Sequence, residues 1–217
     1  MKEVQDHWFK KAKEDGYRAR SAYKLLAIDE RFRILKRGMR VLDAGAAPGS
    51  WTQVASKIVG EHGEIVSVDL KKIDPRGLAK NVRLMCGDLR QISLKDFGGY
   101  FDVILSDMAP DTTGVPMADA AISVRLCHAL LDLSKEVLKV GGDLAMKVFE
   151  GGEYLELLAR AKNIFCEAQG YKPTSSRAES VEMFIVCSKY KGRKFDQATT
   201  TTRVKPPPAA GWKSGGA

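Results

Sequence analysis

The chain has 217 residues, of which 44% are hydrophobic and 29% charged, and it carries a formal net charge of +8. This balance is typical of one soluble α/β domain with a sizeable core. No apolar run approaches the roughly 20 residues that span a bilayer, and the charged start of the chain argues against a secretory signal peptide, so we expect a cytoplasmic protein without membrane contact.

The predicted elements change character near Arg40. Residues 2–35 have the apolar spacing of a helix that is interrupted near Gly16. Beyond Arg40, short apolar runs alternate with helical stretches. Because these runs are continuous, they predict strands of a parallel sheet that is buried on both faces. The predicted strands are 40–45, 64–70, 82–88, 101–107 and 142–149, and the predicted helices are 50–59, 74–80, 116–139 and 152–164.

Two further strands, 165–173 and 182–190, are predicted near the end of the chain. Their connection is too short for a parallel crossover, which needs about a dozen residues or more, so we expect them to pair antiparallel. Strands that alternate with helices and finish in such a pair are typical of a doubly wound α/β sheet. Residues 191–217 are rich in Thr, Pro, Gly and Ala and predict a basic, disordered tail.

The stretch VLDAGAAPGSW, residues 41–51, joins the end of an apolar strand to a turn with two glycines. Gly45 and Gly49 allow the backbone to approach a ligand where open α/β sheets bind ligands. Asp69 ends the next strand about 20 residues further on, where a carboxylate can accept both hydroxyls of an adenosine ribose. Pro48 lacks a backbone donor and argues against a pyrophosphate site. A ligand with one nucleoside and no phosphate fits better, and S-adenosylmethionine (AdoMet) is such a ligand.

Three carboxylates, Asp69, Asp88 and Asp107, each close a predicted strand. Any one of them could instead cap a helix or form a turn. The three together favour a common site, in which Asp88 could accept a hydrogen bond from the adenine amino group.

Lys147 lies inside the apolar run LAMKVF and could be an edge lysine whose ammonium reaches water. Because burying a lysine is costly, we favour a site lysine that is matched by Asp107.

Several motifs in this order resemble the FtsJ-type ribosomal RNA ribose 2′-O-methyltransferases. They are RARSAYKL (18–25), VLDAGAAPGSW (41–51), SVDL (67–70), CGDL (86–89), ILSDMAPDTTG (104–114), AMKVFEG (145–151) and SSRAESVEMFIVC (175–187). The resemblance covers residues 15–190. It implies an AdoMet-dependent, Rossmann-like α/β fold with a doubly wound, seven-stranded sheet whose last strand is antiparallel.

The resemblance also implies the roles of individual residues. The family's catalytic Lys–Asp–Lys–Glu set falls on Lys24, Asp107, Lys147 and Glu182. The AdoMet contacts fall on Gly49, Trp51, Asp69, Asp88 and Asp107, and Gly45 belongs to the same turn. Ser50 stands where many members have a second glycine. Neither the sequence nor the chemistry indicates a metal ion.

The chemistry explains why lysines and carboxylates are needed. A ribose 2′-hydroxyl has a high pKa, so it must be placed in line with the methyl group and helped to lose its proton. Lys147 could accept that proton as an amine, or stabilise the developing alkoxide as an ammonium. Lys24, Asp107 and Glu182 would influence which form prevails, and these coupled groups leave both roles open.

The positive charge is concentrated at the two ends of the chain. Residues 1–40 hold 12 Lys or Arg against 6 Asp or Glu, and residues 189–217 hold 7 against 1. Such ends attract a polyanion, although solvated ends without a partner would show the same charge distribution.

We therefore expect three parts: a basic helical extension over 1–38 that binds RNA and carries Lys24, a methyltransferase domain over 39–190, and the tail. Candidate phosphate contacts in the extension are Lys10, Lys11, Lys13, Arg18, Arg20, Arg31 and Arg33.

The resemblance thus implies an AdoMet-dependent methyltransferase for a ribose 2′-hydroxyl of large-subunit (23S) ribosomal RNA, with a uridine, the family's usual target, as the acceptor. Its partner would be that RNA, either free or within the assembled 50S particle, and the protein would act as a monomer. Two alternatives remain. One is ribose methylation of a tRNA or an mRNA cap, and the other is a non-catalytic RNA-binding protein, against which the intact catalytic set argues.

Overall fold

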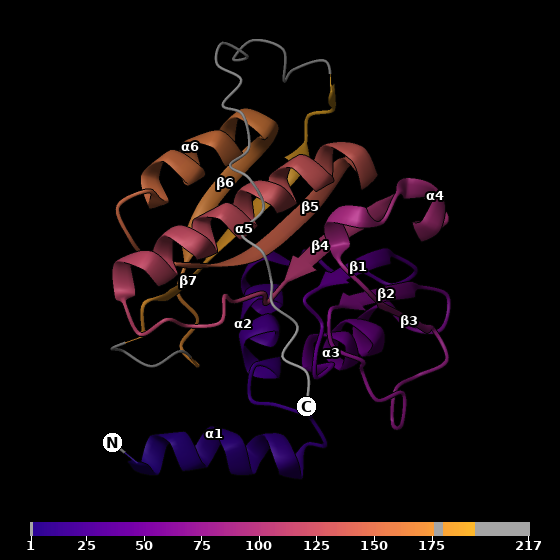
Figure 1. Ribbon diagram of the computed structural model, residues 1–217. Helices are drawn as coiled ribbons and strands as arrows, with labels where there is room; N and C mark the ends of the chain where they lie inside the picture. Colours follow the sequence, from indigo (N-terminus) through magenta and orange to yellow (C-terminus); the bar gives the residue numbers. More distant parts are fainter. Residues whose placement is uncertain (1, 176–179, 194–217) are drawn as a thin grey trace, which may run out of the picture.

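The computed structural model describes residues 2–175 and 180–193 and shows one seven-stranded sheet with helices on both faces (Figure 1). The strand order is β3-β2-β1-β4-β5-β7-β6. The strands are β1 Arg40–Ala44, β2 Glu64–Asp69, β3 Val82–Cys86, β4 Phe101–Ser106, β5 Leu138–Phe149, β6 Phe165–Tyr171 and β7 Glu182–Tyr190. The helices are α1 Lys2–Glu14, α2 Ala22–Phe32, α3 Ser50–Val59, α4 Leu94–Phe97, α5 Pro116–Val137 and α6 Tyr154–Ile164, with a 3₁₀ turn η1 at Leu89–Gln91.

The sheet topology confirms the predicted doubly wound fold. Strands β1 to β5 pair in parallel, and β7 pairs antiparallel with both β5 and β6. The predicted pairing of the last two strands is therefore confirmed, and β7 inserts between β5 and β6. Because β1 lies between β2 and β4, the chain reverses direction across the sheet there, which is the position where such sheets bind ligands.

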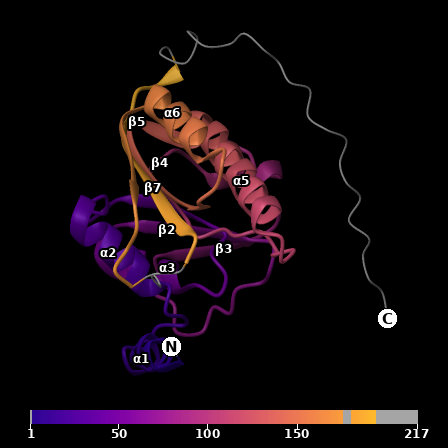
Figure 2. The same ribbon diagram turned by 90° about the vertical axis from the view of Figure 1, so that its left-hand side faces the viewer.

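Two apolar cores fill the spaces between the sheet and its helices. Helices α5 and α6 pack on one face and α2 and α3 on the other, as two perpendicular views show (Figures 1 and 2). Phe165 and Leu131 are fully buried in the first core, and Leu25 and Val54 in the second. The strands between them are apolar on both faces, as predicted for a parallel sheet.

The N-terminal segment corrects one expectation. The interruption predicted near Gly16 is confirmed, because α1 ends at Glu14 and α2 begins at Ala22. Helix α2, however, helps to build the core instead of standing apart from it: Ala22, Leu25 and Ile28 are fully buried against α3 and the sheet. The apolar face of α2 explains this, because it would otherwise be exposed to water. Among the described helices and strands, only α1 lies outside the body, below α2 in both views (Figures 1 and 2).

Helix α1 is attached to α2 through aromatic rings. The Trp8 and Tyr23 ring centroids are 4.8 Å apart, and the Lys11 ammonium lies 5.4 Å from each centroid. The Tyr23 hydroxyl donates to Asp15 Oδ2 over 2.7 Å. Trp8 and Tyr23 therefore pack on each other.

The helix predicted over 74–80 is absent, and residues 70–81 form an irregular loop between β2 and β3. Pro75 and Gly77 interrupt any helix there, and the Asp74 carboxylate accepts a hydrogen bond from the Arg76 backbone N–H over 3.0 Å. A side chain that bonds its own backbone two residues on stabilises a turn in place of a helix. The short elements η1 and α4 were not predicted.

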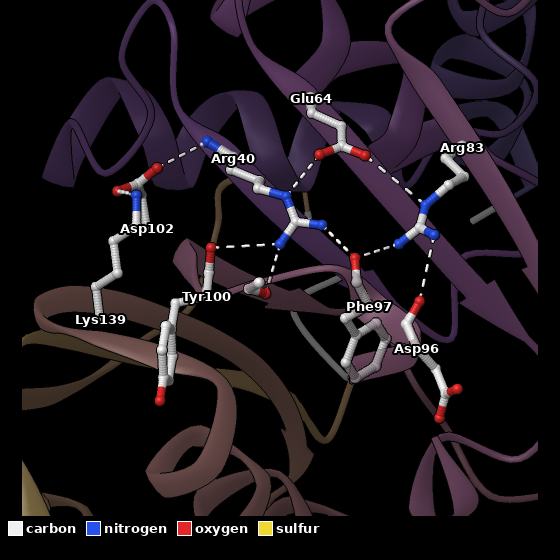
Figure 3. A network of polar contacts seen from close by, with 9 residues as sticks. Arg40, Glu64, Arg83, Asp96, Phe97, Tyr100, Asp102 and Lys139 are labelled. Atoms are coloured by element: carbon white, nitrogen blue, oxygen red, sulfur yellow. Dashed lines mark hydrogen bonds and ion pairs between the residues drawn. The ribbon is translucent and has the colours of Figure 1, made fainter. Parts of the chain in front are cut away.

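A charged network ties the amino ends of the strands together (Figure 3). The Arg40 guanidinium donates to Glu64 and to the carbonyls of Phe97, Gly99 and Tyr100, and it lies 4.4 Å from the Phe101 ring centroid. Arg83, Asp96, Asp102 and Lys139 extend the network. It stabilises the edge of the sheet that is opposite the carboxyl ends.

In the described part of the chain, no helix is long and apolar enough to cross a membrane. The predicted tail, 191–217, lies almost entirely outside the described residues, as does the segment 176–179.

Candidate active site

Most of the predicted site residues lie at the edge of the sheet that the carboxyl ends of β1 to β5 form, whereas Lys24 lies on α2 and Trp51 on α3. Asp69 ends β2, Asp107 directly follows β4, and the glycine turn 45–49 follows β1. Asp88 follows β3 two residues beyond its end. Lys147 lies near the carboxyl end of β5, and Glu182 begins the antiparallel β7, so both lie at the same edge.

The turn after β1 has the geometry that its glycines predict. Gly45 has φ +72°, and a Cβ there would lie 2.2 Å from Met108 Cγ. Gly49, with φ +108°, caps the amino end of α3. The Asp69 carboxylate faces this turn, because Oδ2 accepts from the Ala47 backbone N–H over 2.9 Å and Oδ1 from that of Lys71 over 2.8 Å. The turn and the end of β2 thus form one unit.

Asp88 lies one strand further out. It caps η1 by accepting from the Arg90 backbone N–H, and its carboxylate forms an ion pair with the Arg90 guanidinium at 2.5 Å. The hydrogen bond from the Arg90 side chain holds the pKa of Asp88 below its usual value. The alternative that Asp88 caps a turn is therefore confirmed, and its contact with adenine stays a prediction.

Trp51 differs from the expected cofactor contact. Its indole is 2% exposed, donates to the Ser21 carbonyl over 2.9 Å and stacks on Phe184. The side chain therefore fastens α3 to the start of α2 and to β7. Any contact with a cofactor from this position would come from its backbone at the start of α3.

Asp43 is a residue of this region that the sequence reasoning did not single out. It is fully buried on β1, and its Oδ2 accepts from Thr52 Oγ1 over 2.6 Å, while Oδ1 has no protein partner. Burial raises the pKa of this carboxyl to about 7, and the charges of Asp107 and Asp69 act in the same direction. An acidic residue inside the apolar run VLDA was the signal that could have found it.

Lys147 and Asp107 form the first of two ion pairs. The Lys147 ammonium donates to Asp107 Oδ1 over 2.9 Å and to the Asp107 carbonyl over 2.6 Å, and Lys147 is only 7% exposed. A lysine is rarely buried to this extent unless it is paired. The alternative of an edge lysine that reaches water does not hold.

Lys24 and Glu182 form the second ion pair, with Nζ 2.6 Å from Oε2. Burial alone would raise the pKa of Glu182, but the hydrogen bond and charge of Lys24, together with the charge of Lys147, hold it below its usual value. In the register of β5 and β7, Lys147 faces Phe184 and Phe149 faces Glu182. Lys147 and Glu182 therefore project from the same face of the sheet, the face that α2 covers with Lys24.

A pocket of about 500 Å³ opens over this second pair. Lys24 and Glu182 line it together with Arg20, Phe149 and Ser180. Its other wall includes Thr112 and Gly114, and the loop there is held by Asp119, which accepts from the Thr113 backbone N–H over 2.7 Å and from its hydroxyl over 2.8 Å. The pocket has the size of a small-molecule or nucleoside site.

Among residues 2–175 and 180–193, no cluster of three or more His, Cys, Asp or Glu side chains could hold a metal ion.

The family model of the FtsJ-like methyltransferases matches residues 17–190. The chain belongs to this family. A ribosomal RNA large subunit methyltransferase E from Nitratidesulfovibrio vulgaris is 43% identical over 197 residues, which cover 88% of this chain and 96% of that protein. The protein of the same name from Bdellovibrio bacteriovorus is 41% identical over 187 residues, covering 83% of this chain and 94% of the relative.

The comparison with solved structures agrees with this membership. A crystal structure from Plasmodium falciparum whose description gives it as a ribosomal RNA methyltransferase has a TM-score of 0.71 and 28% identity. It covers 82% of this chain and all of the other chain. The resemblance inferred from the motifs is therefore confirmed, and so is the seven-stranded methyltransferase fold with an antiparallel last strand.

Proposed function

We propose that this FtsJ-like methyltransferase transfers the methyl group of AdoMet to a ribose 2′-hydroxyl of large-subunit ribosomal RNA, with a uridine as the target. The names of the relatives support the RNA substrate. The observation that carries the proposal is the pairing of Lys147 with Asp107 beside the Lys24–Glu182 pair at the edge of a pocket.

The residues at the carboxyl ends of β1, β2 and β3 suit AdoMet. Asp69 and Asp88 provide acceptors for a ribose and for an adenine amino group, and the turn at Gly45 and Gly49 brings backbone close to the same edge. Asp43 keeps an unpartnered oxygen there, close enough to Asp69 and Asp107 for their charges to act on it. A concentration of carboxylates is complementary to a ligand with a sulfonium and an ammonium group.

When bound, AdoMet supplies a methyl group that its sulfonium already activates. The chain's own task is then to place and deprotonate the 2′-hydroxyl. Lys147 Nζ is the group for this step, either as an amine that accepts the proton or as an ammonium that stabilises the alkoxide. Asp107 fixes its position through two hydrogen bonds, one from the ammonium to the carboxylate and one to the carbonyl.

Lys24 and Glu182 would define the acceptor side of the site. Glu182 opposes the positive charge of both lysines, and Lys24 reaches the pocket from the basic N-terminal segment. Arg20 lines the same pocket and is exposed enough to meet a phosphate. A nucleotide could thus insert its ribose toward Lys147 while its backbone lies against α2 and the start of the chain.

We further propose that the basic part of residues 1–38 binds RNA, that the protein acts as a cytoplasmic monomer, and that the target can be part of the 50S particle. Methyl transfer from labelled AdoMet to free 23S RNA, to 50S subunits from cells lacking the gene, and to tRNA tests this. Transfer to large-subunit RNA in either form supports the proposal. Transfer to tRNA alone would replace it with the second candidate substrate.

A further inference from the structure

Arg18 connects the N-terminal segment to both sides of the proposed cofactor site. Its guanidinium donates through Nη1 to the Pro48 carbonyl over 2.8 Å and through Nη2 to the Asp74 carbonyl over 2.6 Å. Nη2 also donates to the carbonyl of Arg76. One side chain therefore bridges the glycine turn after β1 and the loop that follows β2.

This bridge reaches the middle of the loop between β2 and β3. The loop contains no regular element, and its backbone hydrogen bonds from Leu78 to Pro75 and from Val82 to Ala79 are local. At its far end, Asn81 is bonded to Ser56 and to the Gly60 carbonyl. Within the described residues, the hydrogen bonds that tie Asp74 and Arg76 to another part of the fold come from Arg18. The loop begins directly after Asp69, so its position affects the strand end that we assign to the ribose.

Arg18 itself is anchored to α3. Its backbone N–H donates to Gln53 Oε1 over 2.9 Å, and Gln53 Nε2 donates back to the Gly16 carbonyl over 3.0 Å. A Cβ on Gly49 would lie 2.8 Å from Arg18 Nη1, so the guanidinium lies directly against the turn. The fork of a guanidinium can bond several carbonyls at once, which the ammonium of a lysine does not reproduce.

We propose that Arg18 is a positioning residue that orders the AdoMet pocket from the N-terminal segment, and that it is not one of the phosphate contacts. This rests on the proposed function, because it assumes that the turn and the end of β2 hold AdoMet. The two roles make opposite predictions for a lysine at this position. Lysine keeps the charge that a phosphate contact needs but loses the three-carbonyl bridge.

The test measures AdoMet affinity by calorimetry and 23S RNA affinity over a salt series for Arg18→Met, Arg18→Lys and the control Arg37→Met. Arg37 is an exposed arginine in the same basic region. We expect about tenfold weaker AdoMet binding for both Arg18 variants, within the usual range for coupled elements. Arg37→Met should leave AdoMet affinity unchanged, and Arg18→Met should lower RNA affinity no more than Arg37→Met does.

Kinetics separate positioning from general destabilisation. Positioning raises the KM for AdoMet and leaves kcat at saturating AdoMet within about twofold, whereas partial unfolding lowers the active fraction without changing affinity. Hydrogen exchange in residues 70–81 should become faster in both Arg18 variants. Wild-type AdoMet affinity in Arg18→Lys together with lost RNA affinity in Arg18→Met would overturn the inference. Failure of the wild-type protein to bind AdoMet would instead refute the proposed function.

Discussion

Within residues 2–175 and 180–193, the ammonium of Lys147 is held by a single residue, Asp107, through its carboxylate at 2.9 Å and its carbonyl at 2.6 Å. These residues are 40 positions apart in sequence and lie at the ends of adjacent parallel strands. Two acceptors on one residue fix the direction of the amine as well as its distance. Such fixing is what a proton transfer to or from Lys147 requires.

Replacing Lys147 should affect the chemical step. We expect Lys147→Ala to retain AdoMet affinity and most RNA affinity and to lose about 10²–10⁴-fold in single-turnover methyl transfer. Lys147→Arg should not restore transfer, because a guanidinium stays protonated and has another shape. Near-normal transfer by the alanine variant would reduce Lys147 to a structural role.

Replacing Asp69 should weaken cofactor binding. Asp69→Ala removes two acceptors for the ribose, and hydrogen bonds to a charged group contribute roughly 1.5–3 kcal/mol each, so we expect AdoMet affinity to fall at least tenfold by calorimetry. The same change frees the backbone N–H groups of Ala47 and Lys71. Glu61→Ala, at a carboxylate that is 88% exposed, is the matched control. An unchanged affinity in folded Asp69→Ala would refute this pocket.

The Lys24–Glu182 pair should show strong coupling. Lys24→Met and Glu182→Gln should each lower the free energy of unfolding by roughly 1–3 kcal/mol, and the double variant should lose clearly less than their sum. Because the folded-state pKa of Glu182 is lowered, its contribution is present above the ordinary value of 4.5 and is lost as the pH falls through the folded-state value. Urea unfolding at pH 7 and in acid measures this, and additive effects at pH 7 would contradict a working ion pair.

Asp43 should make stability depend on pH in the opposite direction. Its folded-state pKa of about 7 lies above the ordinary 3.8, so the stabilisation is complete below the ordinary value and is lost as the pH rises through 7. Between pH 5 and 8, the wild type should lose on the order of 2–3 kcal/mol relative to Asp43→Asn. Urea unfolding of both proteins across this range measures the difference, and parallel pH profiles would show that Asp43 is ionised throughout.

The exposed lysines of α1 should contribute to RNA affinity. Lys11 packs over Trp8 and Tyr23, so we would change only Lys10 and Lys13 to Glu. We expect weaker RNA binding and a flatter salt dependence, by about 0.7 in log–log slope for each lost contact on single strands, with unchanged AdoMet affinity. Lys80→Glu with Lys95→Glu, before β3 and in α4, is the control of equal charge. Equal effects of both pairs would indicate net charge alone.

The sequence predicted the sheet because short, continuous apolar runs between helical stretches are typical of parallel strands that are buried on both faces. It predicted the strand-end acids for the same reason, since parallel strands bring their carboxyl ends to one edge. It could not join Lys24 to Glu182, which are 158 positions apart, except through the family motifs. No local pattern encodes such a long-range contact.

Other features depend on neighbours that local patterns do not specify. The Trp51 indole is buried because it donates to the Ser21 carbonyl and stacks on Phe184. The carbonyls that Arg18 contacts belong to residues 30, 56 and 58 positions away in the sequence. Because these contacts leave no local pattern, the basic cluster around Arg18 was interpreted as a set of phosphate contacts. The prediction of a helix over 74–80 was wrong because Asp74, Pro75 and Gly77 favour a turn. The average helix propensity of the whole stretch did not reveal this.

The most direct test of the central claim is a map of ribose 2′-O-methylation across total RNA. Cells lacking the gene would be compared with the same cells complemented by the wild-type chain or by Lys147→Ala. We predict that one large-subunit uridine loses its 2′-O-methyl group, that the wild type restores it, and that Lys147→Ala does not. An unchanged methylation map in the deletion strain, or full restoration by Lys147→Ala, would contradict the account.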